Sequence, residues 1–254
     1  MARDEYPRET VSRASCAVGP NTTIDRVPPS IIAIDGPAGA GKTVIGLWLA
    51  DYLRYTFFDT GVLYRASAWL ALTNSVAIDD ADAIVALIER ATIDVDSPQP
   101  SDAERGYTVT IDGHAVTDSL FTAEVNASVS PVAAHSAVRA ALLPVQRRIG
   151  ARGSVVMVGR DVGTTVLPDA ELKIYLDASI DERARRRWEQ EHRRGGTRTI
   201  EAVRADVAHR DALDTGRGSS PLRVADDAHR VDTDDLSLDD EKKAILDLVT
   251  MSRG

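Results

Sequence analysis

Eight consecutive residues, Gly36 to Thr43, have the spacing of a loop that binds phosphate. They read G-P-A-G-A-G-K-T and match the pattern G-x-x-x-x-G-K-[ST]. Glycines let backbone N–H groups curl around an anion without a Cβ atom in the way. Lys42 can reach the outer phosphates of a nucleoside triphosphate, and the Thr43 hydroxyl can contact Mg²⁺. The predicted triphosphate site, with Thr43 at the metal, consists of Gly36, Pro37, Ala38, Gly39, Ala40, Gly41, Lys42 and Thr43.

The segments on either side of this loop agree with that interpretation. Residues 30–35 are a largely apolar run of strand length, and residues 44–54 contain no helix breaker except Gly46. A strand, a glycine-rich turn and a helix are the context that the motif requires, and the N-terminus of the helix adds partial positive charge. The alternative is an ordinary glycine-rich turn with a surface lysine, and both flanks disfavour it.

A second group of polar residues follows the predicted strand 55–59, where a helix opens at Thr60. Because α/β folds bind ligands at the carboxyl ends of their strands, we expect Thr60, Tyr64 and Arg65 to face the cleft. Tyr64 and Arg65 can hold a phosphate together, since arginine makes forked, charge-assisted contacts. A helix cap followed by two surface residues fits the same spacing, so the sequence leaves both interpretations open.

A third group follows the predicted buried strand 153–158, where Arg160 and Asp161 again point at the cleft. The alternative for these two residues is a structural Arg–Asp pair. Another strand covers residues 172–176. The predicted helix 181–194 carries six arginines with few acidic partners expected, and it ends at Gly195 and Gly196. Such a helix suits a lid that closes over phosphates and excludes water.

Composition limits the kinds of partner. The 254 residues carry a formal net charge of −9, which argues against a general nucleic-acid binder, whereas arginines gather at 183–198 and 204–223 and indicate a small anionic ligand. No apolar run approaches membrane-spanning length, and no signal peptide is visible. The single cysteine, Cys16, excludes an internal disulfide framework and a cysteine-rich metal site. We expect a cytoplasmic monomer with no nucleic-acid or membrane partner.

The order of the predicted elements indicates an α/β fold: a P-loop kinase core with a parallel sheet flanked by helices, an inserted domain and a helical lid. Residues 1–29 are polar and proline-containing and are expected to form a disordered tail. The core covers 30–75 and 151–254, with the lid at about 183–200. The insert covers 76–150. It includes a helix over 79–91, a hairpin over 108–117 with its turn at Asp112-Gly113, and helices at 123–130 and 135–148 with Pro131 near their junction.

Several arginines besides those of the lid indicate a second anion site. They are Arg65, Arg139, Arg160, Arg210 and Arg217. Phosphoryl transfer needs alignment of donor and acceptor and positive charge around the transferred group. Two anion sites in one cleft favour a kinase of a phosphorylated acceptor over a GTPase or a motor protein.

The chain resembles the bacterial cytidylate (CMP) kinases, a branch of the nucleoside monophosphate kinases, from about residue 30 to 250. The motifs that carry the resemblance are I-D-G-P-A-G-A-G-K at 34–42, D-T-G-V-L-Y-R at 59–65, V-S-P-V-A-A at 129–134, V-R-A-A-L at 138–142, Q-R at 146–147, G-R-D-V-G-T at 159–164, L-P-D-A-E-L-K-I-Y-L-D-A-S at 167–179, E-R-A-R-R-R at 182–187, R-D-A-L-D-T-G-R at 210–217, S-P-L at 220–222 and V-D-T at 231–233.

The resemblance implies transfer of the γ-phosphoryl group of ATP to CMP or dCMP, with Mg²⁺ bound beside the donor. Small-molecule nucleotides are then the partners. The implied acceptor-phosphate residues are Thr60, Arg65, Arg160 and Arg217, assisted by Tyr64. The implied cytosine readers are Ser130, Arg139 and Asp161, and the implied sugar or phosphate contacts are Arg210 and Asp214. The implied catalytic residues are Lys42, Arg160 and the lid arginines Arg183, Arg186 and Arg187.

Three positions depart from the family pattern. Val44 stands where the family has Ser or Thr, with Thr43 restoring the general loop pattern. Val158 stands where the family has an acidic residue that helps to orient water around magnesium, and Phe121 stands where the family often has arginine. These departures leave two alternatives open: a kinase of the same fold that acts on another small metabolite, and a catalytically weakened nucleotide-binding protein.

Overall fold

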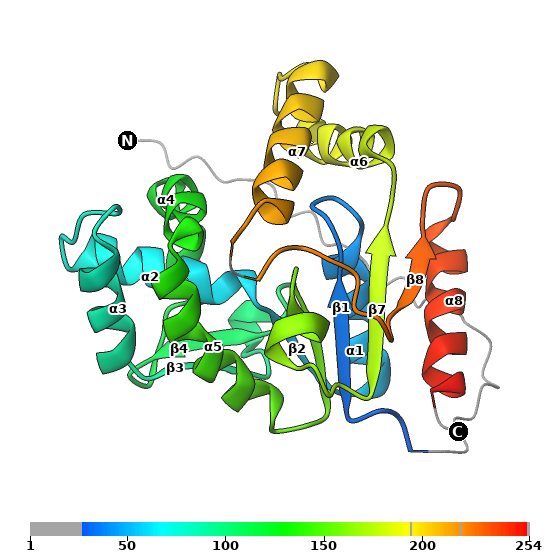
Figure 1. The fold of residues 1–254 in the computed structure, drawn as a ribbon, viewed down its shortest axis with the longest axis horizontal. Coiled ribbons are helices and arrows are strands. Elements are labelled where there is room, and N and C mark those ends of the chain that lie inside the picture. The colour runs from blue at the N-terminus through cyan, green and yellow to red at the C-terminus, as the bar shows by residue number, and fades with distance from the viewer. Residues whose placement is uncertain (1–26, 194, 219, 253–254) are drawn as a thin grey trace, which may run out of the picture.

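The computed structural model describes residues 27–193, 195–218 and 220–252, so most of the predicted tail lies outside the described residues. A five-stranded sheet forms the centre (Figure 1). Its strands are β1 (Ile31–Asp35), β2 (Thr56–Asp59), β6 (Val155–Val158), β7 (Leu172–Asp177) and β8 (His229–Asp232). Their order is β2-β6-β1-β7-β8, and every neighbouring pair is parallel. The predicted α/β class is confirmed, and all the carboxyl ends of these strands meet at one edge.

The phosphate-binding loop leaves this edge between β1 and α1 (Lys42–Leu53). Gly36 begins the loop with φ +147°, and a Cβ atom there would lie 2.0 Å from the carbonyl oxygen of Leu176 in β7. Only glycine permits this close approach, because any side chain would collide with the neighbouring strand. α1 packs against β2 and β6, and α2 (Gly61–Thr73) follows β2. The loop therefore joins a strand and a helix that both pack into the buried apolar core.

The region between α2 and β6 contains its own small sheet. Its helices are α3 (Ala81–Arg90), α4 (Ala123–Ala134) and α5 (Ser136–Gly150), and its strands are β3 (Ile93–Asp96), β4 (Thr108–Ile111) and β5 (His114–Ala115). The three strands are antiparallel in the order β3-β4-β5. The predicted turn at Asp112-Gly113 is confirmed, with φ of 51° and 78° at its two residues. The bounds of 76–150 for the insert and about 183–200 for the lid stay predictions.

Three details of this region differ from the sequence-based prediction. The prediction did not include the strand β3. The strand after the turn covers His114–Ala115 rather than 115–117. Pro131 lies inside α4, and the break between α4 and α5 is at His135. Proline costs a helix one N–H donor and was expected to mark the break. Here Pro131 is on the exposed side of α4, where water can replace the lost hydrogen bond.

Two helices project beyond the carboxyl edge of the sheet (Figure 1). They are α6 (Ile180–Arg193) and α7 (Ile200–Thr215), which pack on each other. The Thr199 side chain caps α7 by accepting a hydrogen bond from Ala202 N, and the last helix, α8 (Leu238–Met251), is capped by Ser237 in the same way. This arrangement puts the arginine-rich helix α6 next to the phosphate-binding loop.

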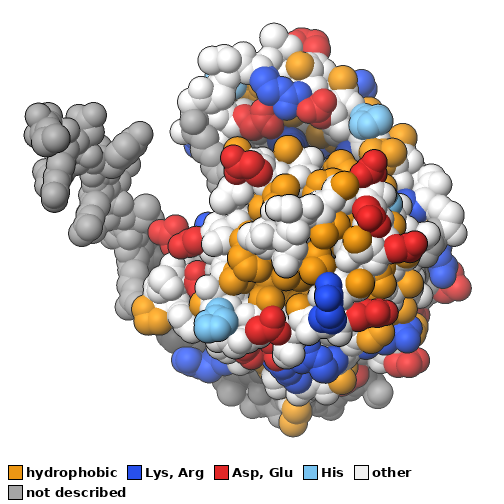
Figure 2. All heavy atoms as spheres, turned by 90° about the vertical axis from the view of Figure 1, so that its left-hand side faces the viewer, with side chains coloured by type: hydrophobic (Ala, Val, Ile, Leu, Met, Phe, Trp, Pro, Cys, Tyr) orange, Lys and Arg blue, Asp and Glu red, His pale blue; other side chains and the backbone are white. Residues whose placement is uncertain are grey.

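The outer face of the insert gathers hydrophobic side chains (Figure 2). A groove between α3 and α5 is lined there by Val85, Ile88, Ala141 and Val145, among others. All of its lining residues belong to the insert, so the groove is separate from the phosphate-binding loop. In the described part of the chain no helix is long and apolar enough to cross a membrane.

Candidate active site

Lys42 is the buried cation of the phosphate-binding loop. Its Nζ donates a hydrogen bond to the carbonyl oxygen of Pro37 at 2.5 Å. Burial lowers the pKa of Lys42 well below its usual value, and the positive charge of Arg160 lowers it further, against the opposing effect of Asp59 and Asp35. An anion in the loop would supply the missing negative charge. This electrostatic setting fits a site for the phosphates of a triphosphate.

Asp35, at the carboxyl end of β1, was not recognised from the sequence. Its two carboxylate oxygens accept hydrogen bonds from Val162 N at 2.8 Å and Gly163 N at 2.7 Å. These bonds hold the turn Val162–Val166 against β1 and so place the preceding residues, Arg160 and Asp161. Burial raises the pKa of Asp35 to about 6 despite both hydrogen bonds. Its position directly before the glycine-rich loop was the only available signal.

The Thr43 hydroxyl faces a second carboxylate that sequence reasoning did not single out. Thr43 Oγ1 donates to Asp59 Oδ2 at 3.4 Å, and Asp59 lies beside Val158 in the sheet register. The described residues contain no group of three or more His, Cys, Asp or Glu side chains that could hold a metal ion. Mg²⁺ usually takes one or two protein oxygens, with waters and substrate phosphates completing its shell. One hydroxyl and one carboxylate beside a phosphate loop fit that requirement.

Asp214 joins two of the predicted substrate arginines. It is 2% exposed, and its Oδ2 accepts a hydrogen bond from Arg160 Nε at 2.8 Å. Arg217 pairs with the other oxygen. Burial lowers the pKa of Arg210, and the charge of Arg160 adds to the effect while Asp214 opposes it. These four side chains therefore lie together, with more positive than negative charge.

Arg139 and Asp161, both predicted to read the base, form an ion pair with each other. Arg139 Nη2 donates to Asp161 Oδ2 at 2.9 Å, and both side chains are buried. The Arg139 guanidinium also lies 5.4 Å from the ring centre of Tyr64. Among the described residues, Arg139 Nε is the one buried side-chain polar atom without a hydrogen-bond partner. A buried donor without a partner is costly, so this atom is available to an acceptor on a ligand.

The remaining predicted substrate residues make other contacts. Thr60 Oγ1 donates to the carbonyl oxygen of Val158 at 3.1 Å. Arg65 Nη1 donates to the carbonyl oxygen of Leu120 at 3.1 Å and to Asn126 Oδ1 at 2.5 Å. Ser130 is exposed on α4. Thr60 thus contacts β6 and Arg65 contacts the insert, and a contact of Ser130 with a base stays a prediction.

The arginines of α6 differ in burial and in their contacts. Arg183 is buried and donates to Asp211 at 3.0 and 2.7 Å, to Ala178 O at 2.9 Å and to Ala38 O at 3.1 Å. Its contacts anchor the lid to the loop, and a contact with the transferred group stays a prediction.

The other lid arginines have acidic partners, contrary to the expectation that such partners were few. Arg186 pairs with Glu182 at 2.7 Å and lies 3.6 Å from Glu241 of α8. Arg187 pairs with Glu191 at 3.2 Å. Arg185 also pairs with Glu189, and these three pairs within α6 have the i,i+4 spacing that pairs side chains on one helix face.

The sequence is similar to those of known proteins over most of its length. The family model described as Cytidylate kinase matches residues 32–251. The chain belongs to the cytidylate kinase family. The cytidylate kinase of Roseiflexus castenholzii is 52% identical over 186 residues, which are 73% of this chain and 80% of the relative. The cytidylate kinase of Lysinibacillus sphaericus is 44% identical over 217 residues, which are 85% of this chain and 95% of the relative. That of Herpetosiphon aurantiacus is 46% identical over 221 residues, which are 87% of this chain and 94% of the relative.

The structure shows where the three residues that depart from the cytidylate kinase family pattern lie. Val158 is 1% exposed, Val44 is 56% exposed on α1, and Phe121 packs against two arginine side chains. The predicted family is confirmed by the match over most of the chain. None of the three departures interrupts the phosphate-binding loop or the Arg160–Asp214 pair.

Proposed function

We propose that this protein transfers the γ-phosphoryl group of ATP to CMP or dCMP, giving ADP and CDP or dCDP. One observation carries the proposal beyond family membership. Asp35, directly before the phosphate-binding loop, accepts hydrogen bonds from Val162 N and Gly163 N, so the preceding Arg160 lies at the same sheet edge as the loop that carries Lys42. A kinase of a phosphorylated acceptor needs this arrangement, because both phosphates must approach each other in line.

The donor nucleotide would bind along residues 36–43, with Lys42 at its outer phosphates. Mg²⁺, held through Thr43 with Asp59 beside it, would neutralise charge on the phosphates of the donor. Arg160 and Arg217, both held by Asp214, would bind the acceptor phosphate. The buried pairing with Asp214 pre-orients both guanidinium groups, so little reorganisation is needed as charge develops.

Arg139 and Asp161 would select the base of the acceptor. Cytosine presents an amino donor and a carbonyl acceptor, which a carboxylate and a guanidinium can satisfy. Arg139 Nε has no partner among the described residues, which supports a ligand contact. A base that lacks this donor–acceptor order would leave buried polar groups unpaired, and such mismatches are strongly rejected.

A panel of monophosphates in a coupled assay of ADP release tests the proposal. We expect turnover of CMP and dCMP well above that of UMP and AMP, with ATP and Mg²⁺ as donor. Preference for another acceptor would support a kinase of a different metabolite, and nucleotide binding without turnover would support a weakened protein. The two alternatives have no structural observation in their favour. The monomeric state, the cytoplasmic setting and the absence of a nucleic-acid partner stay predictions, and size-exclusion chromatography with light scattering tests the first.

A further inference from the structure

One turn of the insert, residues 102–106, is held by hydrogen bonds within the insert. The backbone oxygen of Asp102 accepts hydrogen bonds from Arg105 N at 2.9 Å and Gly106 N at 3.2 Å. The Asp102 carboxylate is buried and accepts hydroxyl hydrogen bonds from Thr108 at 2.6 Å and Thr117 at 3.1 Å. Hydrogen bonds to a carboxylate are stronger than neutral ones, so this turn is held firmly.

Gly106 brings the same turn against the helix that follows the phosphate-binding loop. It has φ +76°, and a Cβ atom there would lie 2.0 Å from Leu47 Cδ1 in α1. The next residue, Tyr107, stacks on Phe57 of β2 with 6.0 Å between ring centres. The backbone conformation favours glycine at this position, and a side chain here would require Leu47 to move. The direction in which Arg105 leaves the turn is therefore set by contacts with the core.

The guanidinium of Arg105 lies 4.0 Å from the ring centre of Phe121, and that of Arg65 lies 4.6 Å from the same centre. Both distances are within the range of cation–π attraction. One ring thus orders two cations, one from the insert and one from α2. Burial lowers the pKa of Arg65, and the nearby charges of Asp59 and Arg105 act on it in opposite directions, so all three groups lie close together.

These two arginines have spare donors and little negative charge to satisfy them. Among the described residues, Arg65 uses only Nη1 in its hydrogen bonds, to Leu120 O and Asn126 Oδ1. Arg105 makes one ion pair in the described part of the chain, to Asp118 at 3.4 Å, and the Asp118 side chain is 81% exposed. Such an exposed, long ion pair contributes little and is readily exchanged for a better anion.

We propose that Arg105 is a further substrate-binding residue that contacts the phosphate of the acceptor nucleotide together with Arg65, with Phe121 as the platform that orients both. The inference rests on the proposed function, because it takes the acceptor to be a nucleoside monophosphate. It also gives Phe121 a role. Its ring is the surface on which the guanidinium groups of Arg65 and Arg105 both lie.

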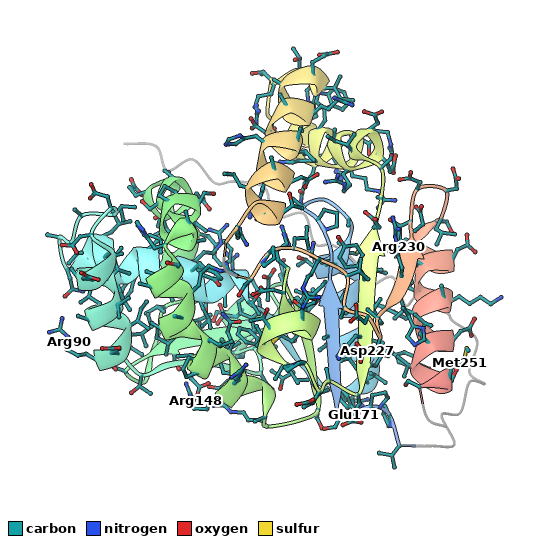
Figure 3. The ribbon with its side chains drawn as sticks, viewed as in Figure 1. Arg90, Arg148, Glu171, Asp227, Arg230 and Met251 are labelled. Carbon is teal, nitrogen blue, oxygen red and sulfur yellow. The ribbon has the colours of Figure 1, made fainter. Side chains whose placement is uncertain are left out.

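The test compares binding of CMP and cytidine by isothermal titration calorimetry for the wild type and Arg105→Gln. Because charge-assisted hydrogen bonds to the phosphate are lost, we expect CMP affinity to fall about tenfold to hundredfold, with cytidine affinity unchanged. Arg90→Gln is the matched control. Arg90 is an exposed arginine of the insert that bonds only to Ala86 O and lies at the outer side of α3, directed away from the molecule (Figure 3). We expect Arg90→Gln to bind CMP and cytidine with the same affinities as the wild type.

The variant Arg105→Met separates a phosphate contact from a packing role. It keeps an apolar stem against Phe121 and removes the charge, so we expect it to lose CMP affinity as Arg105→Gln does. If Arg105 served only to pack on Phe121, Arg105→Met would bind CMP as the wild type does. Equal losses for CMP and cytidine, or a loss below twofold for CMP, would also overturn the inference.

Turnover of CMP by the wild type is measured alongside. If the wild type turns CMP over but Arg105→Gln binds CMP as tightly as the wild type does, the role of Arg105 is refuted and the proposed function is not. A selective loss of CMP binding in a protein that does not turn CMP over refutes the proposed function alone. A wild type that does not bind CMP refutes both.

Discussion

Arg183 of the lid helix α6 donates a hydrogen bond to the carbonyl oxygen of Ala38 in the phosphate-binding loop, with 3.1 Å between the two atoms. The same guanidinium forms two hydrogen bonds with Asp211 of α7. One side chain therefore connects α6 and α7 to the loop that would hold the donor phosphates. This connection makes the position of the lid and the shape of the loop depend on each other.

Replacing Arg183 by methionine should loosen this connection. The variant keeps an apolar stem but removes the buried donors, so we expect the free energy of unfolding to fall by about 2–3 kcal/mol. We also expect a higher KM for ATP, because the Ala38 carbonyl loses its fixed partner. Urea unfolding followed by circular dichroism measures the first effect. Arg193→Met, at an exposed position on the same helix, is the control, and equal stability of the two variants would contradict the anchoring role.

Lys42→Ala should abolish most activity without harming the fold. The lysine is buried, and burial lowers its pKa, so its charge does not stabilise the protein in the absence of an anion. At the reacting phosphates the same charge is expected to contribute about 4 kcal/mol, roughly a thousandfold in kcat/KM. Steady-state kinetics and urea unfolding are measured together, with the exposed Lys243→Ala as control. Retained activity would refute the assignment of the phosphate-binding loop.

Asp35 should make the stability of the protein depend on pH between about 4 and 6. Burial raises its pKa from the ordinary value of 3.8 to about 6, so the folded state binds more protons than the unfolded state in this window. Stability from this group is therefore greatest below pH 4 and is lost as pH rises through 6, by about 3 kcal/mol in total.

Urea unfolding of the wild type and Asp35→Asn at pH 4, 5, 6 and 7 measures this contribution. The stability of the wild type relative to the variant should decline by about that amount from pH 4 to pH 7. Asp79→Asn, an exposed position, should show no such trend. Parallel curves for the wild type and Asp35→Asn would contradict the raised pKa.

Asp161→Asn should impair recognition of the acceptor and spare the donor. The substitution removes the charge opposite Arg139 and presents an amide donor where cytosine would offer its amino group. We expect KM for CMP to rise about tenfold or more while KM for ATP stays within twofold. Asp169→Asn, exposed in the following segment, is the control. An equal rise in both KM values would count against a base-reading role.

Local patterns in the sequence pointed to the loop 36–43, to Arg160 and Asp161 after a buried strand, and to the arginines of α6, whose roles stay predictions. The parallel sheet follows from the order of strands and helices. Asp35 could not be assigned this way, because its partners Val162 and Gly163 are more than a hundred residues away. A hydrogen bond across such a separation has no local signature.

Asp59, Arg105 and the strand β3 were missed for related reasons. The role of Asp59 depends on the hydroxyl of Thr43, and that of Arg105 depends on the rings and charges beside Phe121. β3 is only four residues long, I-D-V-D, and is stabilised by its pairing with β4 rather than by its own composition. Short strands are decided by tertiary context, which outweighs intrinsic propensity.

The structure also predicts the outcome of placing an acid at position 158. The Val158 side chain meets α1 at Gly46, where an added Cβ would lie 2.6 Å from Val158 Cγ1, and it sits beside Asp59 in the sheet register. Val158→Asp would bury a carboxylate next to another one, at a position now 1% exposed. We expect the free energy of unfolding to fall by about 3 kcal/mol or more. We expect no gain in turnover, because the Thr43 hydroxyl already has Asp59 as its carboxylate partner. Val158→Thr, which keeps the shape without the charge, is the control for burying a polar atom. A clear rise in turnover of Val158→Asp with CMP, ATP and Mg²⁺ would contradict this account and show that the metal site needs the acid that most of the family carries.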